Sequence, residues 1–211
     1  MKKIILSLVV VAALLTSCKE NKKDKVEAKE AVKVAVVAAL DNVDVDSSVI
    51  TWKGAKSTGD AHDGTILLKG GSLNLEEGKL TGGSFVIEMA TMKNLDLDAE
   101  SGAKLVGHLS APDFFDVATY ATAKFVITNV EETDNNLSVT GNLTVKDITK
   151  SITIPATLVT KGNVNTFKSE KFNVDRTDFN IKYASKKFFD NLKDKFINDM
   201  IEFSFSVSTK A

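Results

Sequence analysis

Hydrophobic and polar residues alternate strictly along several stretches of the chain after residue 47. In LSVTGNLTV (137–145) the hydrophobic side chains fall on one face and the polar side chains on the other. The same alternation runs through GSFVIEMA (83–90), SITIPATL (151–158) and MIEFSFSVS (200–208). A period of two is typical of β-strands that have one buried and one solvent-facing side. The sequence therefore predicts a fold built mainly from strands.

Turn-forming residues separate the alternating stretches. They occur at Gly70-Gly71, Gly82-Gly83, Asp134-Asn135-Asn136 and Lys161-Gly162-Asn163. Roughly eight strands fit into the chain between these turns, a number typical of a closed barrel or a sandwich. We therefore expect an all-β domain over residues 44–211.

Two stretches interrupt the alternation, residues 98–116 and residues 185–199. Each suits a short helix or a structured loop. In the second stretch Phe188, Leu192 and Phe196 recur every four residues, which predicts one hydrophobic stripe on a helix. We expect one or two short helices in these long connections.

The N-terminus has the pattern of a bacterial secretion signal. Two lysines precede an almost wholly hydrophobic run from Ile4 to Leu15, which is too short to span a bilayer. Leu15-Thr16-Ser17-Cys18 resembles a lipobox, where the signal is cleaved and the new N-terminal cysteine is acylated. The alternative is a plain secreted protein with an incidental cysteine, but the thiol lies at the one position that lipidation requires.

These features divide the chain into three parts. Residues 1–17 are predicted to be a lipoprotein signal peptide, and residues 18–43 a charged, flexible tether that carries lipid on Cys18. The domain of 44–211 is then secreted across the inner membrane and held on a membrane by its acyl chains. Lys19 follows the cysteine, which resembles the sorting pattern for the outer membrane.

Composition and motifs exclude several classes of function. The 211 residues carry a formal net charge of −1, whereas nucleic-acid binding needs a concentrated basic face. The chain contains no nucleophile elbow, no phosphate-binding loop and no dinucleotide fingerprint. His62 and His108 with nearby aspartates lack the spacing of known metal sites, so solvated or capping histidines are the better interpretation. We expect no enzyme activity, metal or cofactor, and nothing in the sequence specifies an oligomeric state.

Arg176 is the only arginine among 27 basic residues. A guanidinium group suits a planar partner such as a carboxylate, a phosphate or several backbone carbonyls. If FNVDRTDFNI (172–181) is a strand, alternation places Arg176 and Asp178 on the same side. Two interpretations remain: a structural ion pair at a barrel rim, or contact with an anionic lipid head group.

Several segments together resemble the YceI-like family of secreted bacterial proteins. They are SSVITWKGAKSTGDAHDG (47–64), HLSAPDFFDVATYATAKF (108–125), VTGNLTVKDITKSITIPATL (139–158), FNVDRTDFNI (172–181) and YASKKFFDNLKDKFINDMIEFSFSV (183–207). The resemblance covers nearly the whole chain after residue 44. It implies a lipocalin-like antiparallel β-barrel around a hydrophobic channel that binds polyisoprenoids or similar lipids, without catalysis.

We therefore expect a lipid-anchored carrier or sensor of an isoprenoid or another long-chain lipid. The side chains expected to line its cavity are Phe85, Phe114, Phe115, Phe125, Phe179 and Phe203. Arg176 and His108 are candidates for its mouth, where Lys182 is a further possible donor to a charged head. The alternative is a stress-related or protein-interaction module whose barrel is filled by side chains, with Phe114 and Phe115 as ordinary core.

Overall fold

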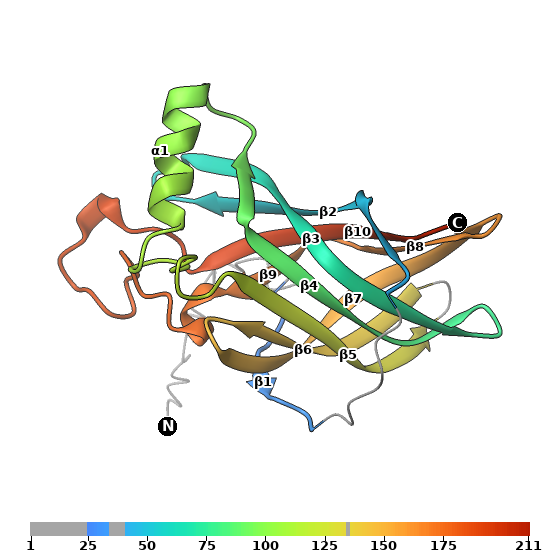
Figure 1. Cartoon of the computed structure of the whole chain (residues 1–211). Helices are drawn as coiled ribbons and strands as arrows, with labels where there is room; N and C mark the ends of the chain where they lie inside the picture. The colour runs from blue at the N-terminus through green and yellow to red at the C-terminus, as the bar shows by residue number, and fades with distance from the viewer. Residues whose placement is uncertain (1–24, 34–40, 134–135) are drawn as a thin grey trace, which may run out of the picture.

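The computed structural model describes residues 25–33, 41–133 and 136–211. Eight antiparallel strands form its main body (Figure 1). They are β2 (Val43–Ala55), β3 (Ala61–Glu76), β4 (Lys79–Asn94), β5 (Thr122–Thr133), β6 (Asn136–Val145), β7 (Ile148–Lys161), β8 (Val164–Ser169) and β10 (Met200–Thr209). The predicted strands are confirmed.

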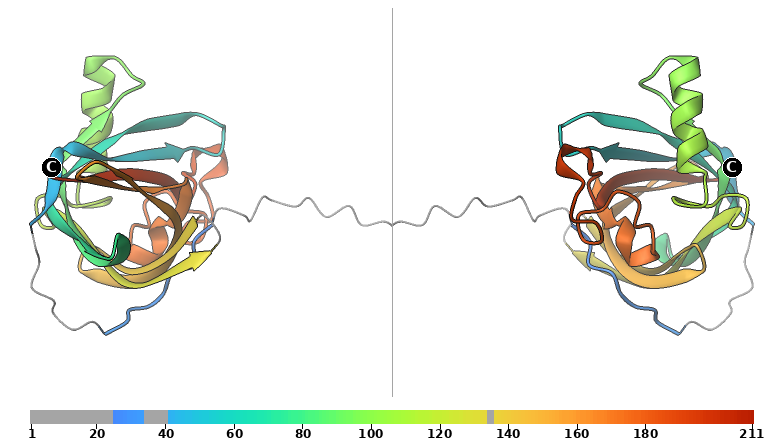
Figure 2. Two further views of the ribbon diagram at one scale, coloured as in Figure 1. Left: turned by 90° about the vertical axis from the view of Figure 1, so that its right-hand side faces the viewer. Right: turned by 90° about the vertical axis from the view of Figure 1, so that its left-hand side faces the viewer.

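The strands close into a barrel. Neighbours follow the order β7-β6-β5-β4-β3-β2-β10-β8, and a further pairing of β8 with β7 completes the ring. Figure 2 looks along the barrel and shows the strands surrounding one interior. The expectation of a lipocalin-like antiparallel barrel of about eight strands is confirmed, because every strand has a partner on both sides over part of its length.

Two short strands lie beside the ring. Strand β9 (Phe172–Asp175) pairs with the start of β10, which β8 does not reach. Strand β1 (Lys29–Glu30) pairs with Ser151 and Lys150 of β7, before the point where β8 begins to pair. Each short strand therefore covers an edge that the ring leaves open.

Part of the predicted flexible tether belongs to the barrel. The backbone N–H of Val26 donates to the carbonyl of Asn173 at 3.0 Å, and the Val26 side chain is buried in the hydrophobic core. Asn142 exchanges two hydrogen bonds with the backbone of Val32. Residues 25–33 thus differ from a flexible tether, because Lys29 and Glu30 pair with β7 and their neighbours hydrogen-bond to β9 and β6. Cys18 and the predicted signal peptide lie outside the described residues.

Helix α1 (Ala99–Leu109) confirms the expectation of a helix within residues 98–116. The Asp98 side chain caps it by accepting hydrogen bonds from the backbone N–H groups of Glu100 and Ser101. Leu105 and Leu109 pack against the hydrophobic core at one end of the barrel, where α1 lies beside β4 (Figure 1). None of the helices in the described ranges is long and hydrophobic enough to cross a membrane.

The helical stripe expected in residues 185–199 is wrong. All of these residues are described, and their only helical turn is the 3-10 helix η3 (Lys193–Lys195). The segment instead returns on itself, because the Ile197 N–H donates to the Ala184 carbonyl at 2.9 Å. A helix of about 12 residues would carry its ends about 18 Å apart. Phe188 is consequently exposed rather than packed in a stripe.

A hydrophobic cavity inside the barrel

The barrel interior is not completely filled. A cavity of about 110 Å³ lies among side chains contributed by most strands of the ring. Its lining consists of Ile50, Ile66, Leu68, Phe85, Ile87, Met89, Phe115, Ala123, Phe125, Leu143, Val145, Ile152, Ile154, Phe172, Val174, Phe203, Phe205 and Val207. Every one of these side chains is hydrophobic. Such a cavity offers water no hydrogen-bonding partner and takes nonpolar molecules instead.

A second cavity of about 90 Å³ lies next to the first, on the side of α1. Ile66, Phe115 and Phe203 line both cavities and therefore stand between them. Lys56, Asp60, His62 and Asn198 border this cavity, but its surface is almost wholly hydrophobic. The two cavities together form a hydrophobic interior, which residues with polar side chains border at one end of the barrel.

Five of the six phenylalanines predicted to line a cavity do so. Phe85 and Phe125 line the first cavity, Phe114 lines the second, and Phe115 and Phe203 line both. Strand register explains the positions of Phe85 on β4 and Phe125 on β5, which lie opposite each other, whereas Phe114 and Phe115 lie in the connection between α1 and β5. The structure thus brings together aromatic side chains from distant parts of the sequence around one hydrophobic space.

Phe179 and His108 lie elsewhere. Phe179 is buried in the core but lines neither cavity. His108 is at the end of α1, where its ring meets the Tyr183 ring edge-on with 4.7 Å between the ring centroids. Its Nε2 lies 3.6 Å from a carboxylate oxygen of Asp113. His108 lines neither cavity, so its position does not support a role at the mouth.

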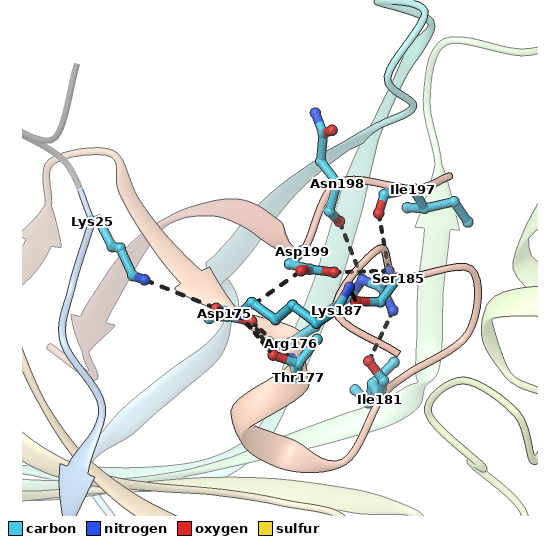
Figure 3. A network of polar contacts seen from close by, with 10 residues as sticks. All are labelled: Lys25, Asp175, Arg176, Thr177, Ile181, Ser185, Lys187, Ile197, Asn198 and Asp199. Atoms are coloured by element: carbon cyan, nitrogen blue, oxygen red, sulfur yellow. Dashed lines mark hydrogen bonds and ion pairs between the residues drawn. The ribbon is translucent and has the colours of Figure 1, made fainter. Parts of the chain in front are cut away.

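Arg176 is buried, with 2% of its surface exposed, and lines neither cavity. Its guanidinium donates hydrogen bonds to three backbone carbonyls: Nε to Asn198 at 3.2 Å, Nη1 to Ile181 at 2.8 Å and Nη2 to Ile197 at 3.1 Å (Figure 3). An oxygen of the Asp199 carboxylate lies 3.4 Å from Nη2. These contacts favour the structural interpretation of Arg176 over contact with a lipid head group.

The expected placement of Arg176 and Asp178 on one side of a strand is wrong. Strand β9 ends at Asp175, and residues Arg176–Phe179 form the 3-10 helix η2. The Asp175 side chain caps this helix by accepting hydrogen bonds from the backbone and hydroxyl of Thr177. Burial opposes ionisation of Asp175, but hydrogen bonds from Lys187 and Thr177 outweigh it and lower the pKa of the carboxyl.

The two histidines do not form a metal site. No group of three histidine, cysteine, aspartate or glutamate side chains in 25–33, 41–133 and 136–211 is arranged to hold a metal ion. His62 instead contacts Asp96, with 2.8 Å between Nδ1 and the carboxylate oxygen. The other oxygen of Asp96 accepts from the backbone N–H of Asp63 and from the Asn94 amide.

The hydrogen bond with His62 is the main reason that the pKa of Asp96 is lowered to about 2. An aspartate with a lowered folded-state pKa stabilises the protein above its unfolded pKa, near 3.9. This contribution is lost as the pH falls from about 4 to about 2. We therefore expect Asp96→Asn to lower the urea midpoint at pH 5 and to have little effect at pH 2. An equal loss at both pH values would contradict this account, and Asp190→Asn serves as the exposed control.

Alternation did not single out Trp52, although it is the only tryptophan of the chain. Its ring lines the second cavity and is 7% exposed. Among the described residues, its indole Nε1 is one of two buried side-chain atoms without a hydrogen-bonding partner. Gly64 leaves room for the ring, because a Cβ at this position would lie 2.6 Å from it. Trp52 thus adds an aromatic ring to the lining of the second cavity, while its Nε1 is buried.

Comparison with known proteins gives a consistent family. The model of the YceI-like domain matches residues 42–209. A UPF0312 protein of Pseudomonas syringae pv. tomato is 48% identical over 56 residues, and protein YceI of Escherichia coli O157:H7 is 38% identical over 56 residues. These alignments cover 26% of the chain and 29% of each relative.

Solved structures show the same fold at low sequence identity. BcnA of Burkholderia cenocepacia has a TM-score of 0.66 at 20% identity, covering 80% of this chain and all of its own. A polyisoprenoid binding domain of Saccharophagus degradans has a TM-score of 0.62 at 13% identity, covering 81% of this chain and 97% of its own. The Campylobacter jejuni YCEI protein has a TM-score of 0.52 at 17% identity, covering 96% of this chain and 99% of its own.

Proposed function

Because the chain belongs to the YceI-like family, we propose that its barrel binds a long-chain, largely hydrocarbon lipid such as a polyisoprenoid. The observation that carries the proposal is the first cavity, whose lining is entirely hydrophobic. Burial of a hydrocarbon chain stabilises a complex by about 25 cal/mol per Å² and needs no polar partner. The description of the Saccharophagus degradans domain as polyisoprenoid binding supports the same class of ligand. No catalytic step is proposed.

A long chain needs both cavities to be joined. Phe115 and Phe203 stand between them, so rotation of these two side chains would connect the spaces. The tail would then occupy the first cavity, and the polar end of the lipid would lie in the second. Asp60, His62 and Asn198 border the second cavity and carry hydrogen-bonding groups for that end of the lipid.

The alternative, a pure interaction module, would have a barrel filled by side chains. Both cavities argue against that alternative.

Trp52 provides a direct test of lipid binding because its fluorescence reports on one place in the chain. We expect farnesol or a longer prenyl alcohol, titrated in mild detergent, to change this emission in a saturable way. Saturation should occur with hydrocarbon-tailed lipids and not with short polar alcohols. An emission that stays constant with every lipid would contradict the proposal.

We further propose that the protein is exported and held in the outer membrane through acylated Cys18. The support is the lipobox-like sequence before Cys18 and the lysine that follows it. Cys18→Ser should prevent incorporation of labelled palmitate and move the protein from the membrane fraction to the soluble fraction. A variant that remains membrane-bound without label would show that acylation is not what holds it there.

A further inference from the structure

Residues 182–196 form a loop at the end of the barrel that carries α1, drawn in orange-red in Figure 1. We call it the aromatic–lysine loop. It exposes three aromatic side chains: Tyr183 at 40%, Phe188 at 46% and Phe189 at 49%. Two adjacent phenylalanines half open to solvent are unusual in a protein that buries most of its other phenylalanines. Such a pair indicates a surface that meets a partner.

The same loop concentrates positive charge. It contains five lysines and two aspartates, although the whole chain has a net charge of −1. The Lys182 Nζ lies 4.8 Å from the centroid of the Phe188 ring, and the Lys186 Nζ lies 3.8 Å from that of Phe196. Lys182, Lys186, Lys193 and Lys195 form no ion pair with another described residue. Exposed aromatic rings among free lysines match the chemistry of an anionic membrane surface.

The base of the loop is held firmly. Arg176 hydrogen-bonds to the carbonyls of Ile181 and Ile197, which lie immediately before and after the loop (Figure 3). Lys187 points back to Asp175 and makes a hydrogen bond with its carboxylate. The exposed side chains are therefore presented from a fixed frame, and binding would require little ordering of the backbone.

The loop also borders the second cavity. Ile197 and Asn198, which follow it directly, line this cavity together with Ala55 and Lys56. The loop is also joined to the connection between β2 and β3, because the Ser57 N–H donates to the Phe196 carbonyl at 3.2 Å. A membrane that contacts the loop would therefore lie close to the second cavity.

We propose that the aromatic–lysine loop docks on an anionic phospholipid bilayer. Phe188 and Phe189 insert at the boundary between head groups and acyl chains, and the free lysines face lipid phosphates. Docking directs the second cavity toward the bilayer, so that a lipid passes between membrane and barrel without crossing water. This last step rests on the proposed lipid binding, whereas docking itself does not.

The test uses chain 18–211 with Cys18→Ser, which lacks the acylation site and contains every described residue. It should co-sediment with phosphatidylglycerol vesicles and much less with phosphatidylcholine vesicles. Phe188→Ser/Phe189→Ser and Lys182→Gln/Lys186→Gln should each lower the partition coefficient by about tenfold or more. The controls Val159→Ser and Lys161→Gln/Lys168→Gln alter exposed residues on β7 and β8 and should bind as the parent does.

Equal vesicle binding by the loop variants and the controls, or no binding by the parent, would overturn the proposal. If the parent self-associates without binding vesicles, and the loop variants abolish this self-association, the loop is an interface between two copies instead.

The Trp52 titration separates docking from lipid binding. Loop variants that lose vesicle binding and keep the fluorescence change support docking as a separate property, and a parent that docks without that change would contradict only the lipid-binding proposal.

Discussion

Arg176→Met is expected to lower the free energy of unfolding by about 3–5 kcal/mol, as is typical when one partner of a buried charged network is removed. Methionine fills much of the same space but donates no hydrogen bond. The carbonyls of Ile181, Ile197 and Asn198 would then lose the donor that joins them. Urea unfolding followed by far-UV circular dichroism measures the change.

Two variants show whether the loss comes from the guanidinium group. Arg176→Lys keeps the charge but lacks the planar donors, so it should recover only a small part of the stability. Lys195→Met makes a comparable change at an exposed lysine and should leave the urea midpoint nearly unchanged. If Arg176→Met and Lys195→Met unfold at the same urea concentration, Arg176 does not hold this end of the barrel together.

Ala123→Phe is expected to reduce lipid binding by more than about tenfold, because the new ring would occupy the space proposed for the lipid tail. Ala123 is buried on β5 and lines the first cavity. Added bulk in a packed core lowers the free energy of unfolding by about 1–3 kcal/mol. The loss should be smaller here, because the new ring fills part of the cavity. Trp52 fluorescence titration measures the binding, and thermal unfolding verifies that the variant is folded.

Ala103→Phe is the matched control for this variant. Ala103 is exposed on α1, so the same substitution there adds a ring without entering the barrel. It should bind lipid as well as the parent chain. Unchanged lipid binding by a folded Ala123→Phe variant would show that the lipid tail lies outside the first cavity.

The barrel was predictable from the sequence because long stretches of several strands keep a period of two. This period decides which side chains face inward, and hence that Phe85, Phe125 and Phe203 reach the interior. Closure depends on the pairing of β8 with both β7 and β10, which no local pattern specifies. The family resemblance supplied that part of the prediction.

The errors arose where distant residues override the local pattern. The spacing of Phe188, Leu192 and Phe196 favours a helix, but Arg176 binds the carbonyls on both sides of this segment and closes it into a loop. Similarly, the charged residues 25–33 suggest a free tether, yet Lys29 and Glu30 among them pair with the open edge of β7. A single sequence shows neither partner.

The hydrophobic character of the cavity lining was predictable from the sequence, but the volume of the cavity was not. Hydrophobic periodicity identified Phe85 and Phe203, whereas Phe114 and Phe115 lie in a connection without alternation, and Phe179 is buried but lines neither cavity. Whether inward side chains meet or leave a space depends on their rotamers and on the register of facing strands. Trp52 was missed because a single aromatic residue on a strand is most often core.

Native mass spectrometry of the intact protein purified from its own membranes tests the central claim most directly. The parent chain and Ala103→Phe should each carry one lipid, which solvent extraction releases and tandem fragmentation shows to have a long hydrocarbon chain. Ala123→Phe should appear without it. A parent chain that remains empty after incubation with prenyl lipids, or an Ala123→Phe variant that carries as much lipid as the parent, would contradict lipid binding inside the barrel.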